Sequence, residues 1–192
     1  MRTSPSLHLG LYPRLLGASW YDLDPAIQSA HTSGTVGRAA GVFRVRHGSD
    51  GLARWLIRAA RLPPPAEAVE TRLVVCRRGS AERWHRTFGD TIVVTSQRAG
   101  PDGLLAERLG LLEFRFRLGV ADGALIYRQT GLMLRLGPLR FPLPGRLSPQ
   151  VTAREEPAAR TGEMHVSVEV HTPAGALLFS YEGDVRPEGA TA

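Results

Sequence analysis

The chain has 192 residues, 43% of them hydrophobic and 22% charged, which is the composition of a globular protein and excludes a disordered or fibrous one. A chain of this length fits one domain, and such a domain buries enough surface to need no disulfide or metal for stability. The formal net charge is +6, and all 24 basic residues are arginine.

The absence of lysine and asparagine excludes several chemistries. Without lysine there is no P-loop lysine, no kinase phosphate-binding lysine and no Schiff-base lysine for pyridoxal phosphate or a class I aldolase. Without asparagine there is no N-glycosylation acceptor. The arginines are spread along the chain and form no dense basic run, which favours a solvated basic surface over a nucleic-acid partner.

No segment has the pattern of an export signal or a membrane span. Pro13 and Arg14 interrupt the apolar stretch 9–16, and no window approaches the about 18 apolar residues that a span requires. The single cysteine, Cys76, ends the apolar run 73–76, where a buried and inert thiol is expected. We therefore expect a soluble protein of the reducing cytoplasm with no membrane span.

The first helix signal is Asp24-Pro25, a cap followed by proline in the first turn. It predicts a short helix that ends near residue 31. Residues 36–46 then have the pattern of a first strand, with small residues near its start.

A second helix is predicted over residues 50–61. Leu52, Trp55 and Leu56 fall at helical spacing, and the proline run 63–65 ends the helix. We expect this basic amphipathic helix to cover the core, the alternative being a helix that lies on a membrane surface.

The rest of the chain alternates apolar and polar residues as antiparallel strands do. The predicted strands are 69–78, 82–88, 91–97, 112–118, 125–128, 164–171 and 177–185. Four prolines make the region 137–149 an edge strand or an extended loop. So many strands joined by short turns predict an α+β fold: a barrel-like, curled antiparallel β-sheet, arranged as a meander, with two or three short helices in the N-terminal third. We expect one domain, 8–187, with frayed termini at 1–7 and 188–192.

Several short motifs together resemble a bacterial domain of unknown function, the family numbered four-one-six-six. They are Leu11-Tyr12, Leu16-Gly17, His31, Leu62-Pro63, Trp84-His85-Arg86-Thr87-Phe88-Gly89, Leu143-Pro144, Leu147-Ser148-Pro149 and Tyr181-Glu182-Gly183, and they span about residues 11–187. Members of that family look like stand-alone proteins or tails fused to oxidoreductase-like domains. The resemblance therefore implies a redox neighbourhood and supplies no catalytic residues.

No pattern for catalysis or metal binding is found. His165, Glu169 and His171 share one strand face, but the two histidines lie ~20 Å apart on an extended strand, too far to share a metal. No serine lies in a G-x-S-x-G motif, no glycine-rich dinucleotide motif opens a helix, and Glu155-Glu156 point to opposite faces of a strand. We predict no metal site, no cofactor and no catalytic residue, although an enzyme whose site shows no motif stays open.

One constellation points to an interior charge. On a strand, Glu82, Trp84, Arg86 and Phe88 face the same side. If Trp84 and Phe88 face the interior, Arg86 faces it as well, and a buried guanidinium must be paired.

Two roles of Arg86 stay open at this point. One is a structural ion pair with Glu82, Glu107 or Glu182; the other is an anchor for the anionic head of an apolar ligand. A third possibility is that Trp84 and Phe88 face outward and belong to an interface.

The architecture favours a non-enzymatic domain that binds a small apolar or amphipathic anionic ligand inside the curled sheet. The candidate ligand-binding residues are Arg86, Trp84, Phe88, Glu107 and Tyr181. The alternative is an accessory module that docks on an oxidoreductase-type partner protein. An internal cavity favours ligand binding, whereas a filled barrel with an exposed apolar patch favours docking.

Overall fold

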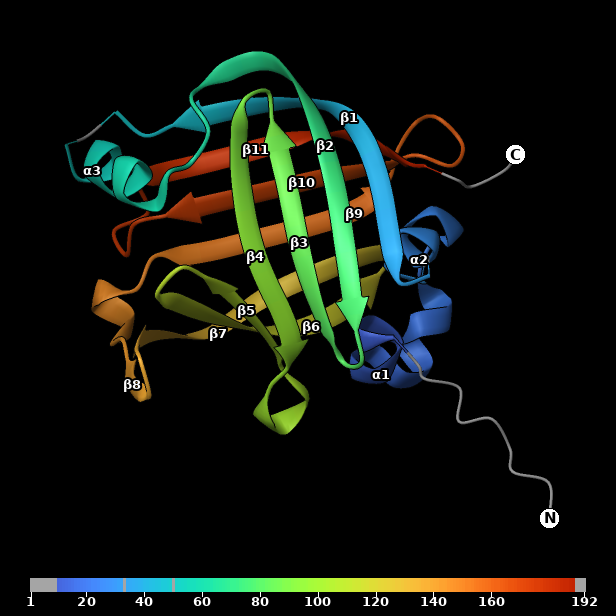
Figure 1. Ribbon diagram of the computed structural model, residues 1–192, viewed down its shortest axis with the longest axis horizontal. Helices are drawn as coiled ribbons and strands as arrows, with labels where there is room; N and C mark the ends of the chain where they lie inside the picture. Colours follow the sequence, from blue (N-terminus) through green and yellow to red (C-terminus); the bar gives the residue numbers. More distant parts are fainter. Residues whose placement is uncertain (1–9, 33, 50, 189–192) are drawn as a thin grey trace.

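The computed structural model describes residues 10–32, 34–49 and 51–188, and in these ranges it contains eleven strands and three α-helices (Figure 1). The helical segments are α1 (Leu11–Leu16), η1 (Gly17–Asp22), α2 (Pro25–Thr32), α3 (Gly51–Ala60), η2 (Pro101–Gly103) and η3 (Gly145–Leu147). The strands are β1 (Val36–His47), β2 (Ala66–Arg78), β3 (Ala81–Phe88), β4 (Thr91–Ala99), β5 (Leu105–Leu109), β6 (Leu112–Ala121), β7 (Ala124–Leu136), β8 (Leu139–Pro142), β9 (Gln150–Pro157), β10 (Met164–His171) and β11 (Leu177–Pro187).

Ten of these described strands close into a barrel. Each strand from β1 to β7 pairs with the next, β7 pairs with β9, and β11 returns to pair with β1. Every pairing is antiparallel, and β8 pairs with β7 alone, outside the ring. The expected fold class, a barrel-like antiparallel meander with helices near the N-terminus, is confirmed. In Figure 1 the strands β2, β3 and β4 run roughly vertically in front of β9, β10 and β11, which run roughly horizontally.

Most sequence-predicted elements lie where the periodicity placed them, but two strands were missed. β5 and β9 have charged residues on both faces, which hides the alternation. The region predicted as an edge or loop, 137–149, contains the edge strand β8, whose four residues are all exposed. The predicted frayed ends lie outside the described residues, except for Glu188, whose backbone N–H donates to Arg38 O at 2.7 Å.

The N-terminal helices close one end of the barrel. Leu11, Tyr12 and Ile27 are each at most 1% exposed and pack inside the ring. The predicted cap is present, since Asp24 Oδ1 accepts from Ala26 N at 2.8 Å. The backbone N–H of Asp24 also donates to Gly123 O in the turn between β6 and β7, which fixes this helical plug to the wall.

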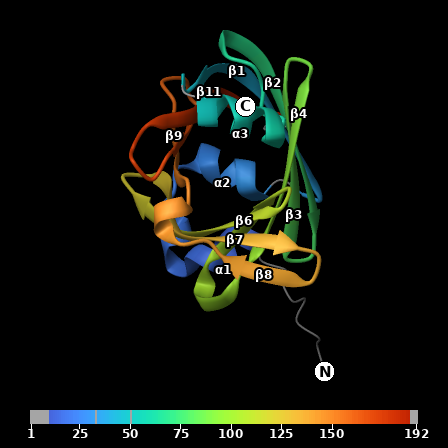
Figure 2. The same ribbon diagram turned by 90° about the vertical axis from the view of Figure 1, so that its left-hand side faces the viewer.

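The segment α3 lies at the opposite end, between β1 and β2. Figure 2 looks at this end, with α3 above and β7 and β8 below. Ile57 of α3 is buried against the barrel, whereas the side chains of Leu52, Trp55 and Leu56 lie outside the described part of the structure, so their predicted packing stays a prediction. Among the described residues, no helix is long and apolar enough to cross a membrane.

The pairing of β1 with β11 closes the ring, and two glycines make it possible. Gly41 pairs with Val185, and Gly183 pairs with Phe43. A Cβ on Gly41 would stand 2.0 Å from Asp184 O, and one on Gly183 would stand 2.2 Å from Val42 O. Both separations are far below van der Waals contact, so any side chain here would push the two strands apart.

We expect Gly41→Ala and Gly183→Ala each to lower the free energy of unfolding by about 1–3 kcal/mol, the usual cost of forcing a methyl group into a packed site. The matched control is Gly119→Ala in β6, where an added Cβ meets no atom within 4 Å. Urea denaturation of the three variants measures the difference. Equal stabilities of the seam variants and the control would contradict this account of closure.

Candidate ligand-binding cavity

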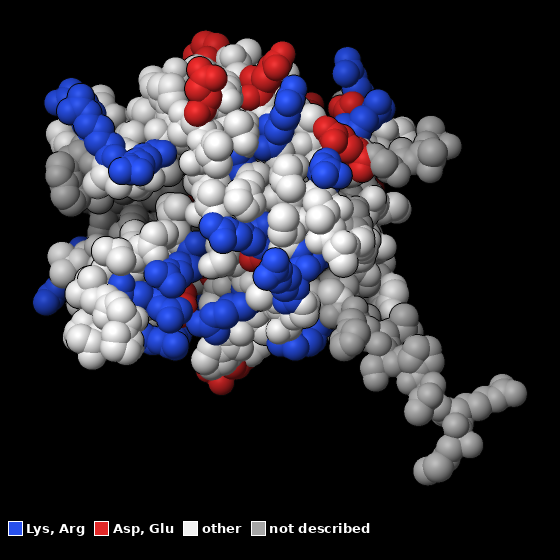
Figure 3. Space-filling view, viewed as in Figure 1, with Lys and Arg blue, Asp and Glu red and all other residues white. Residues whose placement is uncertain are grey.

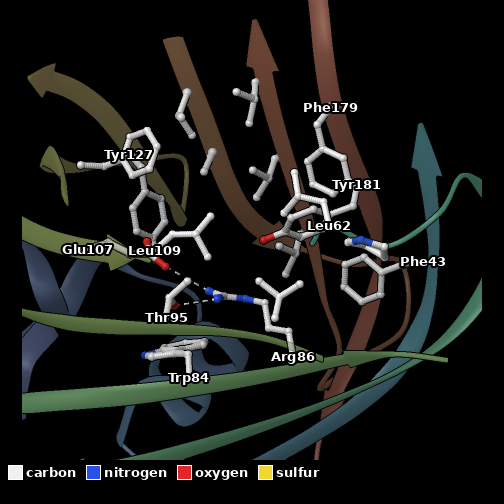
Figure 4. Close-up of a pocket in the computed structure, with 18 of the residues that line it drawn as sticks. Phe43, Leu62, Trp84, Arg86, Thr95, Glu107, Leu109, Tyr127, Phe179 and Tyr181 are labelled. Atoms are coloured by element: carbon white, nitrogen blue, oxygen red, sulfur yellow. Dashed lines mark hydrogen bonds and ion pairs between the residues drawn. The ribbon is translucent and has the colours of Figure 1, made fainter. Parts of the chain in front are cut away.

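The barrel encloses a cavity of about 240 Å³ with a largely apolar wall. Its lining comes from the ten strands of the ring and from the α3 side, where Ile57, Leu62 and Pro63 line it. The five sequence-predicted residues, Arg86, Trp84, Phe88, Glu107 and Tyr181, all line this cavity. Figure 4 shows Arg86 projecting from β3 and Tyr181 from β11 into the same space. That they bind a ligand stays a prediction.

The alternation of side chains along β3 places Arg86 inside the barrel, as the sequence predicts. Trp84 and Phe88 are 4% and 3% exposed, and Arg86 lies between them on the same face. The side chain of Arg86 keeps 17% of its surface accessible. The alternative in which Trp84 and Phe88 face outward is therefore wrong.

Arg86 is held by three contacts. Its Nη1 donates to Thr95 Oγ1 at 2.9 Å, and its Cζ stands 5.1 Å from the centre of the Trp84 ring. Its Nη2 lies 3.6 Å from Glu107 Oε1, which is an ion pair longer than a hydrogen bond. Of the three carboxylates proposed from sequence, Glu107 is the partner.

The other two candidate carboxylates are engaged elsewhere. Glu82 is buried and accepts from Trp84 Nε1 at 3.0 Å and from Arg77 Nε at 3.3 Å. Arg77 in turn donates to Ala30 O of α2 at 2.9 Å, so Glu82 helps to tie the helical plug to β3. Glu182 lies on the outside of β11, where Arg44 Nη1 stands 3.4 Å away.

Arg86 and Tyr181 present more hydrogen-bond donors to the cavity than the described residues accept. A guanidinium has five N–H donors, and for Arg86 the hydrogen bond within the described chain is the one to Thr95. The Tyr181 hydroxyl makes no hydrogen bond to the described residues. Burial raises the pKa of Tyr181, and the nearby charge of Arg86 lowers it less, so the phenol stays protonated as a donor.

A second polar cluster, which the sequence analysis missed, forms the end of the cavity near the helices. Glu155 of β9 is 8% exposed; its Oε1 accepts from Tyr127 Oη at 2.8 Å and its Oε2 lies 2.8 Å from His31 Nε2. The Tyr12 ring lies against His31, with ring centres 3.8 Å apart and ring planes tilted by 36°, and its hydroxyl donates to Gln97 Oε1 at 2.7 Å. This cluster joins α1 and α2 to the walls β4, β7 and β9.

The charge states within this cluster follow from its contacts. Burial raises the pKa of Glu155, but His31, the hydrogen bond from Tyr127 and the charge of Arg86 outweigh it and hold that pKa below its ordinary value. Burial and the charge of Glu155 both raise the pKa values of Tyr12 and Tyr127 well above 10.0. The site is thus an ionised carboxylate surrounded by neutral phenol donors.

Two features of the sequence could have indicated this cluster. Tyr12 and His31 belong to the short motifs that carry the family resemblance, and Val151, Ala153 and Glu155 alternate in β9. The lining of the cavity, as far as it is described, contains no serine, cysteine or histidine. The described residues also contain no group of three or more histidine, cysteine or acidic side chains that could hold a metal ion.

Fold and cavity define a small closed antiparallel barrel with a polar group on its inner wall. The chain belongs to the family described as "Domain of unknown function (DUF4166)", whose model matches residues 23–185. No curated protein and no solved structure matches the chain significantly.

The Glu155 cluster predicts a defined pH dependence of stability. Because the pKa of Glu155 in the folded protein lies below the ordinary 4.5, the stability it supplies is complete above that value and is lost as the pH falls through the folded pKa. Glu155→Gln should be about 3 kcal/mol less stable at neutral pH and should lose less stability than wild type on acidification.

The control is Glu156→Gln, which changes the next residue, whose side chain is 40% exposed and pairs with Arg154 at 2.6 Å on the surface. It should follow the wild-type curve of stability against pH. Identical acid slopes for wild type and Glu155→Gln, measured by urea denaturation at several pH values, would contradict the assignment.

Proposed function

We propose that this domain binds a small amphipathic ligand inside the barrel, with an acidic head at Arg86 and an apolar tail along the aliphatic wall. The observation that carries the proposal is the excess of donors on Arg86 and Tyr181 in an otherwise apolar cavity. These donors are accessible from the cavity, since no atom of Arg86 or Tyr181 is among the described side-chain atoms buried without a partner, and a bound carboxylate accepts from several of them at once. The ligand-binding residues proposed are Arg86, Trp84, Phe88, Glu107 and Tyr181.

Glu107 is compatible with such a ligand because its contact with Arg86 is long. At 3.6 Å the pair provides charge balance in the free protein without using a guanidinium N–H in a short hydrogen bond. A ligand carboxylate that accepts directly from Arg86 and Tyr181 replaces a weak contact with stronger ones. The negative charge of Glu107 disfavours a second acidic group on the ligand.

The size of the cavity restricts the ligand further. A volume of about 240 Å³ lies just below the range of ordinary drug-sized pockets and holds roughly eight water molecules. A compact acid fits entirely inside, and a longer chain must leave through the end of the barrel near α3 and β8.

The cavity favours this function over the two alternatives. A module that only docks on an oxidoreductase-type partner needs no internal space, and a filled barrel is the usual state of a small closed sheet. An enzyme needs a reactive group beside the substrate, and the described lining of the cavity contains no serine, cysteine or histidine. We therefore propose binding without turnover, with no cofactor and no nucleic-acid partner, in the cytoplasm.

The first test compares fatty acids with their methyl esters. Wild type should take up saturated acids, in a series from hexanoic to palmitic, more tightly than the matching esters, measured by displacement of a fluorescent fatty acid. Arg86→Met should weaken acid binding roughly ten- to hundredfold, the value of about 1.5–3 kcal/mol for hydrogen bonds to a charged group. Ester binding should change little.

The matched control for this test is Arg83→Met, which removes an exposed arginine from the outer face of the same strand. Its affinity for acids should equal that of wild type. Equal affinity of wild type for acids and esters would reject the role of Arg86, and absence of binding to both would reject the ligand class.

A second test identifies the natural ligand. Native mass spectrometry of the protein purified from its own host should show a retained small molecule that dissociates on activation. The same purification of Arg86→Met should yield the empty protein, while Arg83→Met keeps the ligand. A protein of bare mass in all three preparations would count against the proposal.

A further inference from the structure

The hairpin of β7 and β8 stands outside the closed ring and is amphipathic. In its register Leu134 pairs with Phe141 and Leu136 with Leu139, so these four apolar residues share one face. Arg135 pairs with Arg140 and lies on the other face. The ring closes without β8, so closure does not explain why this hairpin carries apolar side chains.

The apolar face of the hairpin is exposed, and two segments joined to the hairpin, the β5–β6 turn and η3, each expose a further leucine. Leu136, Leu139 and Phe141 are 46%, 57% and 46% exposed. Leu147 of η3 and Leu111 of the β5–β6 turn are 64% and 52% exposed. The carbonyl oxygen of Leu111 accepts a hydrogen bond from Arg135 N at 2.8 Å, which joins that turn to the hairpin. We call these five residues the hairpin patch; exposed apolar groups gathered in one place mark interaction sites.

The hairpin patch borders the cavity. Leu112, which lines the cavity, pairs with Leu134 of the hairpin, and Pro149, which follows η3, lines it as well. Figures 1 and 2 place β8 and α3 at the same end of the barrel. A surface that contacts this end therefore lies next to the cavity.

The exposed charged residues around the hairpin patch are positively charged. Arg108, Arg140 and Arg146 are exposed around it, and the sequence has no acidic residue from 123 to 154. The neighbouring Glu113 is 1% exposed and neutralised by Arg98 and Arg135. Figure 3 shows arginines crowded over the lower left of the molecule, where β5 and β8 lie, while most acidic side chains in that view lie near the top.

The segment α3, which lies across this end of the barrel from the hairpin, is also positively charged. Arg54, Arg58 and Arg61 are exposed, and the range 51–66 contains no acidic residue. Both elements that flank the end of the cavity thus offer guanidinium groups, which bind phosphate oxygens in bidentate fashion.

We propose that the hairpin patch docks on an anionic lipid surface. Leucine and phenylalanine enter the boundary between head groups and acyl chains, and the surrounding arginines bind the lipid phosphates, as in other interfacial amphipathic elements. The role we assign to this docking is the transfer of an amphipathic ligand between the membrane and the cavity. That role rests on the proposed function. The docking itself does not depend on a ligand.

The test is flotation with vesicles of phosphatidylcholine alone or mixed with phosphatidylglycerol. Wild type should float with the mixed vesicles, bind the neutral ones at least about tenfold less, and be released by salt. The double variant Leu139→Ser/Phe141→Ser should lose at least about tenfold in binding to the mixed vesicles. Arg140→Glu/Arg146→Glu should lose it as well.

Matched controls distinguish docking from nonspecific binding to vesicles and from unfolding of the variants. Ile92→Ser changes a residue that is 60% exposed on β4, and Arg83→Glu reverses a charge on the outside of β3; both should bind as wild type. Melting temperatures should be unchanged because every substituted side chain is exposed. No flotation of wild type, or equal flotation of the hairpin variants and the controls, would overturn the proposal.

Fatty-acid displacement in the absence of vesicles distinguishes the two proposals. The hairpin variants should bind acids as wild type does, whereas Arg86→Met should float as wild type does. Failure of flotation with intact acid binding rejects docking alone, and the reverse result rejects the ligand proposal alone.

Discussion

The closure of ten strands into a ring is the constraint on which the rest of this structure depends. Eight strands enclose an interior that side chains alone just fill, and each added strand widens it. The surplus width explains what the ring contains. One end admits the helical plug with Leu11 and Tyr12, and the middle keeps the cavity.

In this widened interior, a buried polar group needs hydrogen-bond partners from several elements. Glu155 is stable there because a phenol and an imidazole from different elements contact its two oxygens, at 2.8 Å each. Arg86 differs, since Glu107 balances its charge from 3.6 Å while most of its N–H groups face the cavity. The same barrel thus contains a carboxylate whose two oxygens both have partners, in a cluster where His31 Nδ1 has none, and a guanidinium that the proposed ligand completes.

The sequence predicted those features that depend on local periodicity. Alternation placed Trp84, Arg86 and Phe88 on one inner face, and the barrel class followed from the number of strands. Alternation fails where a charge faces inward, which is why β5 and β9 were missed and Glu155 was dismissed. The contact between His31 and Glu155 spans 124 residues, and no local pattern encodes such a pair. Glu113 shows the same limit, because it is 1% exposed and pairs with Arg98 and Arg135, and no local pattern encodes these two contacts.

The pairing of β1 with β11 has a consequence for how the chain acquires its structure. Residue 39 meets residue 187 across it, so the last described strand completes a ring that the first strand began. Until that strand is available, β1 offers an open edge of unpaired backbone groups to any extended chain nearby. Topologies dominated by such distant pairings fold in about milliseconds to seconds. During synthesis the protein therefore passes through a stage in which its closing edge is exposed, and the time spent there is set by the rate of translation.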